Sequence, residues 1–345
     1  MNRIFLSAAG IAAGIIVTFF VRKTAIKFRI VNDPNPIVPQ HTVPVAYLGG
    51  LAILISVSSV LIVIYFFFPG LNSYFKTEKH VLTAIITDSI LFTLLGLYDD
   101  LKQLKAITKF SGQLLLSVIA VSIGLQSGIF GNDTLDKIFS VFWILFVVNA
   151  VNFTDVCDGL MSSICAVTFL TIALLVPGIN LFYLVFASAT IGFLFFNAPR
   201  ASIFLGDAGS HLIGFLFAAT GLAGTTERSV FDAVVWLWLI AAIPVFELIF
   251  ITTIRIRKGL PWWKGSPDHF SLRMQAAGLS RWQINIIAIL VSLLTVTVAC
   301  LFLQFDVTAK SVTVFLILLF FAICWKVLLK YEVTKTNPVK KTITI

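Results

Sequence analysis

Residues 138–160 read IFSVFWILFVVNAVNFTDVCDGL, and this stretch indicates both the class of fold and the place of its chemistry. An apolar run comes first, and Asn149, Asn152, Asp155 and Asp158 then follow at every third position. On a helix this spacing puts neighbouring members on one face. Carboxylates are costly in or beside hydrocarbon, so acids at such a place are candidates for function.

The composition predicts a membrane protein. The chain has 345 residues, of which 59% are hydrophobic and 12% charged, and its mean hydropathy is +1.00. These values exclude a soluble two-domain enzyme and predict an all-α, polytopic integral membrane protein. Because a spanning helix needs roughly 20 apolar residues, we expect about 10–11 transmembrane helices. The expected spans lie near residues 4–21, 45–68, 81–97, 110–128, 138–153, 159–176, 181–197, 211–224, 232–254, 284–303 and 311–329. Together they form a single membrane-embedded domain over residues 1–345, with a short basic tail at 331–345.

The distribution of Lys and Arg predicts the orientation. Most of the 25 basic residues fall in the loops after odd-numbered spans and in the C-terminal tail, which carries Lys335, Lys340 and Lys341. Cytoplasmic loops carry an excess of positive charge, so we expect these loops in the cytoplasm and the N-terminus outside. No basic domain stands clear of the bilayer, which argues against nucleic acid binding.

The acids lie at the cytoplasmic ends of the expected spans. The span near 81–97 ends in Asp99 and Asp100, and Lys102, Lys105 and Lys109 follow. Adjacent carboxylates repel, which raises the pKa of one of them unless a cation offsets the charge. Such a pair suits either Mg²⁺ coordination or proton abstraction.

Two further loops have chemical character. The segment Gly206-Asp207-Ala208-Gly209-Ser210 opens the span near 211–224. Glycines let a backbone approach a ligand closely, and a helix N-terminus offers free N–H groups to phosphate. The basic loop after the span near 232–254 contains the run Asp268-His269-Phe270-Ser271-Leu272-Arg273. Glu247, within that span, is expected to orient a residue of this loop, whereas Asp88 has no explanation.

Taken together, these loops resemble one family, the polyprenyl-phosphate N-acetylhexosamine-1-phosphate transferases, which includes the phospho-N-acetylmuramoyl-pentapeptide translocase. The resemblance runs from about residue 30 to about residue 280. The motifs that carry it are His41-Thr42-Val43-Pro44, Leu48-Gly49-Gly50, the Asp99-Asp100 pair, the Asn/Asp stripe, Phe204-Leu205-Gly206-Asp207-Ala208-Gly209-Ser210 and the basic loop. It implies transfer of a sugar 1-phosphate from a UDP-sugar to undecaprenyl or another polyprenyl phosphate, with release of UMP. It also implies a multi-pass protein of the bacterial inner (plasma) membrane, with a cytoplasmic active site, and a homodimer.

The resemblance further implies a role for each matching residue. Asp207 resembles the ligand of Mg²⁺, with Mn²⁺ as an alternative metal, and Asp99 the base or phosphate-orienting acid, with Asp100 beside it. The other implied positions are Asp155 and Asp158 in the nucleotide pocket, Phe204 stacked on uracil and Asn197 at the pyrophosphate, with Asn152 a further ligand-binding candidate in the same stripe. For the mechanism we further expect Lys102 or Lys105 to anchor the lipid phosphate, and His269 and Arg273 to contact the sugar-phosphate.

The sequence also departs from the family pattern. The family usually has His-x-His-His in the basic loop, but here His269 is followed by Phe270, Ser271 and Leu272. This change puts the identity of the sugar in doubt and leaves open a catalytically inactive member. A transporter or channel is another alternative, because membrane acids also form cation paths.

Overall fold

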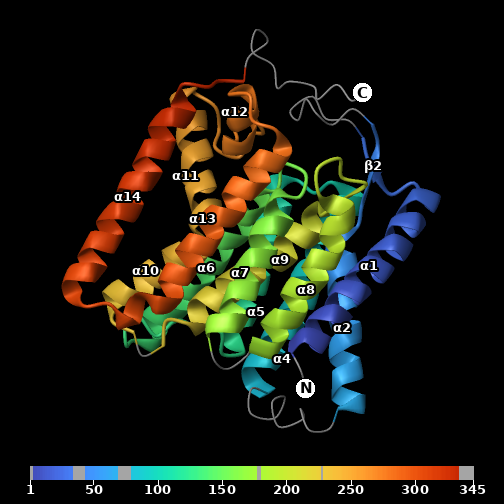
Figure 1. Ribbon diagram of the computed structural model, residues 1–345, viewed down its shortest axis with the longest axis horizontal. Helices are drawn as coiled ribbons and strands as arrows, with labels where there is room; N and C mark the ends of the chain where they lie inside the picture. Colours follow the sequence, from blue (N-terminus) through green and yellow to red (C-terminus); the bar gives the residue numbers. More distant parts are fainter. Residues whose placement is uncertain (1–2, 34–42, 69–78, 177–179, 227, 334–345) are drawn as a thin grey trace.

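The computed structural model describes residues 3–33, 43–68, 79–176, 180–226 and 228–333, which form a bundle of helices (Figure 1). The helices in the first half of the chain are α1 (Arg3–Lys27), α2 (Gly49–Phe67), α4 (Lys79–Lys102), α5 (Ala106–Ser122), α6 (Asp133–Thr154) and α7 (Leu160–Leu175). Those in the second half are α8 (Asn180–Asn197), α9 (Gly206–Ala223), α10 (Val230–Ile240), α11 (Ala242–Arg257), α12 (Phe270–Ala276), α13 (Arg281–Leu301), the 3₁₀ turn η2 (Phe302–Gln304) and α14 (Val307–Leu329). The prediction of an all-α membrane protein is confirmed.

Each expected span has a counterpart in this bundle, but not every counterpart is a complete span. Among the described residues, seven helices are long and apolar enough to cross a membrane, or up to eight if the bent pair α10–α11 counts as one. Helices α5 and α7 are apolar but shorter, with 17 and 16 residues. A count of apolar residues alone therefore overestimates the number of helices that meet the full length of a span.

Helix α9 lies within the bundle and carries one end of the polar site. All of its residues from Ala208 to Leu222 are buried, and it packs mainly against α4 and α6. Phe92 of α4 stacks on Phe215 of α9 with 5.0 Å between the ring centroids. A helix that is apolar on all sides is stable only when it is surrounded, which explains its central position.

At one side of the bundle α1 packs closely against α8 (Figure 1). A Cβ atom added to Gly14 would lie 2.3 Å from the backbone oxygen of Ala189, and one added to Gly192 would lie 2.4 Å from that of Ile11. Small residues at a helix interface allow backbones to approach, which replaces hydrophobic driving force inside a bilayer.

The expected span near 232–254 is not straight. Helices α10 and α11 meet at Ala241 with a bend of 81°. Pro244 lies in the first turn of α11, where a proline costs no helical hydrogen bond. Beyond α11, helix α14 lies at the edge of the bundle (Figure 1). Only 6% of its apolar stretch is buried within the protein.

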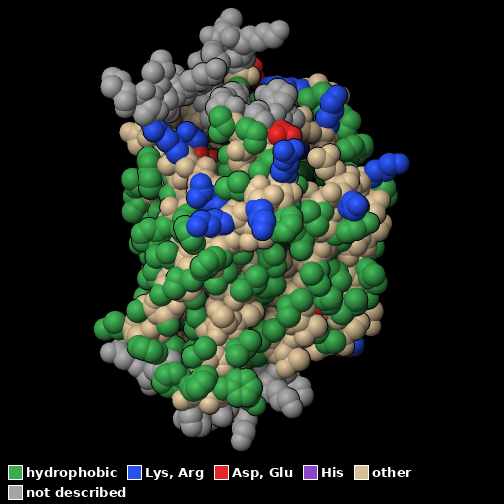
Figure 2. Space-filling view, turned by 90° about the vertical axis from the view of Figure 1, so that its right-hand side faces the viewer, with side chains coloured by type: hydrophobic (Ala, Val, Ile, Leu, Met, Phe, Trp, Pro, Cys, Tyr) green, Lys and Arg blue, Asp and Glu red, His purple; other side chains and the backbone are tan. Residues whose placement is uncertain are grey.

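A small three-stranded sheet lies at the end of the bundle where α9 begins. Its order is β1 (Val31–Asn32), β2 (Val45–Tyr47) and β3 (Ile203–Phe204). Strand β2 is antiparallel to β1 and parallel to β3, with Tyr47 opposite Phe204. In Figure 2 the Lys and Arg side chains gather toward this end of the molecule, above a broad hydrophobic surface.

Some residues singled out in the sequence lie outside the described residues, and Asp88 is described but has no evident role. His41 and Thr42, and Lys335, Lys340 and Lys341 of the expected tail, lie outside the described residues. Asp88 is completely buried in α4, and neither of its carboxylate oxygens has a hydrogen-bond partner among the described residues.

Candidate active site

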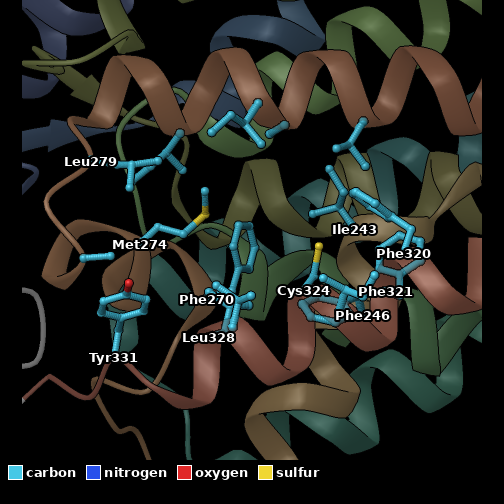
Figure 3. A pocket seen from close by; sticks show the side chains of 17 residues that line it. Ile243, Phe246, Phe270, Met274, Leu279, Phe320, Phe321, Cys324, Leu328 and Tyr331 are labelled. Atoms are coloured by element: carbon cyan, nitrogen blue, oxygen red, sulfur yellow. The ribbon is translucent and has the colours of Figure 1, made fainter.

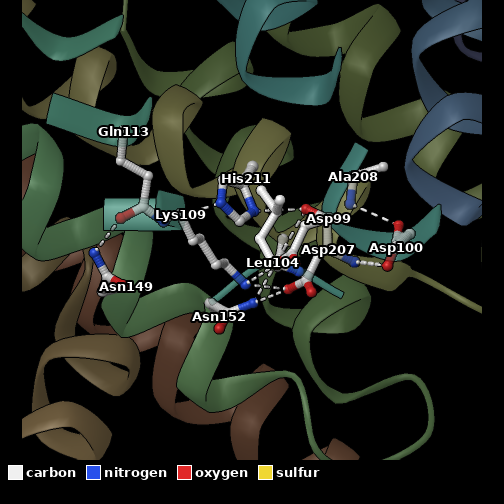
Figure 4. Close-up of polar contacts among 11 residues, drawn as sticks. Asp99, Asp100, Leu104, Lys109, Gln113, Asn149, Asn152, Asp207, Ala208 and His211 are labelled. Atoms are coloured by element: carbon white, nitrogen blue, oxygen red, sulfur yellow. Dashed lines mark hydrogen bonds and ion pairs between the residues drawn. The ribbon is translucent and has the colours of Figure 1, made fainter. Parts of the chain in front are cut away.

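The ammonium group of Lys109 joins two carboxylates from distant parts of the chain (Figure 4). Its Nζ lies 2.8 Å from Oδ2 of Asp99 and 2.8 Å from Oδ1 of Asp207. Asp99 is near the end of α4, Lys109 is in the first turn of α5, and Asp207 is in the first turn of α9. The backbone N–H of Leu104 also donates to Oδ1 of Asp99, at 2.7 Å, which fixes this carboxylate to the turn between α4 and α5.

The Asn/Asp stripe at the end of α6 reaches the same carboxylate cluster. Nδ2 of Asn152 donates to Oδ1 of Asp207 at 2.5 Å and to Oγ of Ser210 at 2.8 Å. Oδ1 of Asp207 therefore accepts hydrogen bonds from an amide and an ammonium group. Donors of this kind stabilise the charged form of a carboxylate. The side chain of Asp207 is 29% exposed, so it is held in place but open to a ligand.

A buried chain of polar side chains supports the backbone of Asp207 (Figure 4). Asn149 Nδ2 donates to Gln113 Oε1 at 2.9 Å, and Gln113 Nε2 lies 2.9 Å from His211 Nε2. Nδ1 of His211 lies 2.7 Å from the backbone oxygen of Asp207. Because that oxygen only accepts, Nδ1 carries the proton, and Nε2 of the neutral ring accepts from Gln113.

Gln113 and His211 were not among the predicted site residues, although the sequence held a signal for them. Gln113 lies four residues after Lys109, and His211 lies four residues after Asp207. Residues four apart share a helix face. A polar residue that lies four positions from a functional residue, in an otherwise apolar helix, thus extends the site by one turn.

Asp100 does not join the cluster around Lys109. Its Oδ1 accepts from the backbone N–H of Asp207 at 2.8 Å, and its Oδ2 accepts from that of Ala208 at 3.0 Å. The hydroxyl of Tyr47 donates to the backbone oxygen of Asp100 at 2.6 Å. The two adjacent carboxylates thus point to different partners, one a side chain and the other the start of a helix.

The last two members of the stripe diverge. Asp155 follows directly after α6, and burial, together with the negative charges of Asp207 and Asp158, raises its pKa to about 7. Asp158 forms an ion pair with Arg281 at the start of α13, and its Oδ2 also accepts from the backbone N–H of Ala201 at 3.2 Å. The stripe therefore connects the carboxylate cluster to α13.

The basic loop is fixed by two separate sets of side-chain contacts. Nδ1 of His269 lies 2.6 Å from Oε1 of Glu247, whose Oε2 accepts from the backbone N–H of Phe270 at 3.1 Å. The prediction that Glu247 orients a loop residue is confirmed. Asp268 is bound by Arg273 at 2.7 Å and by Lys258 at 2.8 Å.

The chain is similar to known proteins of one family. Residues 82–225 match the family model described as glycosyl transferase family 4. The probable undecaprenyl-phosphate N-acetylglucosaminyl 1-phosphate transferase of Bacillus subtilis is 32% identical over 281 residues, covering 77% of this chain and 75% of that protein. The chain belongs to the polyprenyl-phosphate N-acetylhexosamine-1-phosphate transferases.

Other members of this transferase family are similar over most of their length. The decaprenyl-phosphate N-acetylglucosaminephosphotransferase of Mycobacterium tuberculosis is 28% identical over 320 residues, which cover 82% of this chain and 78% of that protein. The phospho-N-acetylmuramoyl-pentapeptide-transferase of Limosilactobacillus reuteri is 28% identical over 328 residues, which cover 86% of this chain and 97% of that protein.

Two residues expected to contact ligands, Asn197 and Arg273, have structural partners here. Oδ1 of Asn197 accepts from Ser162 at 2.8 Å, and its Nδ2 donates to the backbone oxygen of Ile203 at 2.9 Å. Arg273 is completely buried, with bonds to Asp268 and to the backbone oxygen of Leu328. The structure therefore does not bring the Arg273 guanidinium to the carboxylate cluster, because it is buried against Phe250 of α11 and Leu328 of α14. Phe204 lies in β3 and is partly exposed.

The lysines expected to bind the lipid phosphate, Lys102 and Lys105, are not the lysine that contacts the acids in the structure. Lys102 and Lys105 are exposed, and neither has an ion pair within the described ranges. Lys109 was noted in the sequence without a role, yet it bridges two of the predicted acids. Lys102 is the last residue of α4 and Lys105 directly precedes α5, and both are exposed, whereas Lys109 lies within α5 and is partly buried.

The donors of the site suit Mg²⁺ by type. In the part of the chain that the structure describes, no three or more His, Cys, Asp or Glu side chains are grouped to hold a metal ion. Mg²⁺, however, usually keeps several waters and binds through one or two carboxylates and substrate phosphates. Asp99 and Asp207 supply such carboxylates, and the ammonium group between them marks a point where a positive charge is stabilised.

An apolar cavity lies apart from this polar cluster (Figure 3). It has a volume of about 390 Å³ and lies between α11, α12, α13 and α14. Phe270, which follows His269, is part of its wall, as are Phe246 and Phe321. Its lining contains none of the predicted site residues.

Proposed function

We propose that the protein transfers a sugar 1-phosphate, of the N-acetylhexosamine type, from a UDP-sugar to a polyprenyl phosphate and releases UMP. The reaction would initiate synthesis of a cell-surface glycan. The observation that carries the proposal is the shared Lys109 ammonium, which gathers Asp99 and Asp207 where α4, α5 and α9 meet. Membership of the transferase family supports the same reaction class.

Phosphoryl transfer depends mainly on positioning and on charge stabilisation. Asp207 is the residue best placed to hold Mg²⁺, because Asn152 and Lys109 fix one carboxylate oxygen. When bound, Mg²⁺ would offset negative charge on the donor pyrophosphate. Mn²⁺ would serve the same purpose, since it also prefers oxygen ligands.

Asp99 and Lys109 have complementary tasks in this proposal. Asp99 would take the proton of the lipid phosphate or hold the phosphate in its ionised form. Lys109 offers a positive charge to the attacking phosphate and keeps the two carboxylates from repelling each other. The side chain of Lys109 is 18% exposed, so the ammonium group has limited contact with water, which strengthens its interaction with an anion.

The site would face the cytoplasm of a bacterial cell, where UDP-sugars are available. The basic residues support this orientation, because they gather at the end of the bundle that holds the carboxylate cluster (Figure 2). The His269–Glu247 pair lies in the loop that would contact the sugar-phosphate, with Glu247 fixing the orientation of the ring.

Purified protein, incubated with polyprenyl phosphate, Mg²⁺ and a panel of UDP-sugars, tests the proposal. We expect lipid-dependent release of UMP with at least one N-acetylhexosamine donor, and loss of release when the metal is chelated. Asp207→Asn and Asp99→Asn should each reduce turnover by roughly 10²–10³-fold or more without loss of folding. Near-normal, Mg²⁺-dependent release by Asp207→Asn would refute the assignment. Ion flux without UMP release would favour a transporter, and neither activity would favour an inactive member.

A further inference from the structure

The first turn of α9, which carries Asp207, is capped by a residue from another helix. The first N–H groups of a helix have no partner within it. Leu205, at the N-cap of α9, provides no side-chain hydrogen bond. The carboxylate of Asp100 instead accepts from the N–H groups of Asp207 at 2.8 Å and of Ala208 at 3.0 Å. A carboxylate at a helix N-terminus also interacts favourably with the helix dipole.

The backbones around this cap are in direct contact. A Cβ atom added to Gly96 of α4 would lie 2.3 Å from the backbone oxygen of Asp207, and one added to Gly50 of α2 would lie 2.1 Å from the nitrogen of Gly209. Gly206 has a φ of +75°, and an added Cβ would lie 2.8 Å from Oδ2 of Asp100. A larger residue at Gly96 or Gly50 would therefore require a shift of α9, and one at Gly206 would strain the backbone and crowd the Asp100 carboxylate.

Tyr47 holds Asp100 from the other side. Its hydroxyl donates to the backbone oxygen of Asp100 at 2.6 Å, and its strand pairs with β3, where it lies opposite Phe204 just before α9. Burial, together with the negative charges of Asp100, Asp207 and Asp33, raises the pKa of the Tyr47 hydroxyl. The hydroxyl therefore stays protonated at neutral pH and keeps its role as a donor.

We infer that Asp100 is a positioning residue, which fixes the Asp207 carboxylate by clamping the start of α9, and that Tyr47 in turn fixes Asp100. Both carboxylate oxygens of Asp100 are bound to backbone N–H groups. The carboxylates of Asp99 and Asp207 are bound to the Lys109 ammonium instead. Asp99 is thus part of the carboxylate cluster, whereas the neighbouring Asp100 fixes the geometry of that cluster. The importance of Asp207 in this inference rests on the proposed function.

Amide hydrogen exchange tests the clamp without any substrate. Peptides covering residues 204–212 would be followed in the full-length protein and in Asp100→Ala, Asp100→Asn, Tyr47→Phe and Asp99→Asn. We expect exchange at Asp207 and Ala208 to rise by about tenfold or more in Asp100→Ala, because two hydrogen bonds are lost. Asp100→Asn should lie between, since an amide oxygen can accept one of the two bonds. Tyr47→Phe should show a smaller rise.

Asp99→Asn is the matched control, because Asp99 is adjacent in sequence but does not bond to the α9 backbone. Its exchange over 204–212 should stay at the wild-type rate. Unchanged exchange in Asp100→Ala would overturn the inference, as would an equal rise in Asp99→Asn. If Asp100→Ala does not fold, Asp100→Asn and Tyr47→Phe decide in the same way. These outcomes do not depend on UMP release, so a failure of the proposed function can be told apart from a failure of the clamp.

Turnover then separates positioning from direct chemistry. Asp100→Asn should retain at least tenfold more activity than Asp99→Asn, and its loss should appear as a raised Mg²⁺ concentration for half-maximal rate. A residue acting through Asp207 should add little to the loss in an Asp207→Asn background. Full additivity there, or a loss in Asp100→Asn as large as in Asp99→Asn with wild-type Mg²⁺ dependence, would show that Asp100 acts directly.

Discussion

Nζ of Lys109 lies 2.8 Å from Oδ1 of Asp207, although 98 positions separate the two residues in the chain. The same ammonium group binds Asp99. Removing it would leave two carboxylates side by side with no cation, which is costly where water is limited. We therefore expect Lys109→Met to lower UMP release by roughly 10²-fold or more.

Lys137→Met is a suitable control for this substitution, because Lys137 forms an exposed pair with Asp133 in the first turns of α6, far from the cluster. Exposed pairs of this kind contribute little, so its turnover should match the wild type. Equal turnover in the two lysine variants would contradict the role given to Lys109.

The amide of Asn152 is expected to matter through its charge as well as its shape. Asn152→Asp keeps the size of the side chain but replaces a donor to Asp207 with a third negative charge. Turnover should fall further in Asn152→Asp than in Asn152→Ala, and the fall should be partly relieved by a higher Mg²⁺ concentration. Asn149→Ala, one turn earlier, breaks the bond to Gln113 and should cost less. A ranking in which Asn149→Ala is the most damaged would argue against a direct link to Asp207.

Glu247 is expected to act by orienting His269. Glu247→Gln keeps an acceptor for the N–H of Phe270 but removes the charged partner of the imidazole. We expect turnover to be about tenfold lower, because the His269 ring loses its fixed tautomer. Insertion into the membrane should stay normal. Glu247→Asp, which restores the charge, should recover part of the activity. Wild-type kinetics in Glu247→Gln would show that the pair does not serve the reaction.

The stability of the fold should depend on pH through Asp155. Its pKa is raised to about 7 by burial and by the negative charges of Asp207 and Asp158, whereas an Asp in the unfolded chain has a pKa of about 3.9. The folded state thus binds the proton more tightly, and the stability falls as pH rises from about 4 to about 7. Thermal unfolding of the metal-free protein at pH 5 and pH 8 should show this fall. Asp155→Asn should flatten it, and an identical slope in the variant would contradict the prediction.

Asp268 should give the opposite dependence of stability on pH, with stability lost as the pH falls. Burial alone would raise its pKa, but hydrogen bonds from Lys258 and Arg273 outweigh this and lower it. Its contribution to stability is therefore complete above the unfolded pKa of about 3.9 and is lost as pH falls through the lower folded value. Limited proteolysis of the loop at residues 258–269 should be faster in Asp268→Asn than in wild type at pH 7. The difference should shrink with an acid-stable protease at pH 2–3.

The sequence predicts much of this arrangement because the bilayer restricts what a chain can do. Apolar runs must become helices, so the helices were predictable, although the break in the span near 232–254 and the short lengths of α5 and α7 were not. Polar residues at the helix ends, such as Asp99, Asn152 and Asp207, were therefore predictable as candidates. The link between Glu247 and the basic loop followed from the cost of a buried charge without a partner.

Other assignments needed the packing of helices. Lys109 rather than Lys102 or Lys105 meets the acids, because the turn before α5 sets which lysine faces the bundle. The buried position of Arg273 depends on α14, which contributes the backbone oxygen of Leu328. Spacing along one segment carries no information about such partners, since they come from elements far apart in the chain.

By itself, the sequence determined that this chain is a membrane-embedded helical protein with most of its candidate acids at the helix ends, because hydrophobicity and charge act locally along the chain. Only the tertiary structure decided which partner each acid binds. Asp99 and Asp100 are neighbours in sequence, yet one carboxylate binds Lys109 and the other caps the start of α9. Adjacent residues on a helix point about 100° apart, so their partners depend on which helices pack on each side.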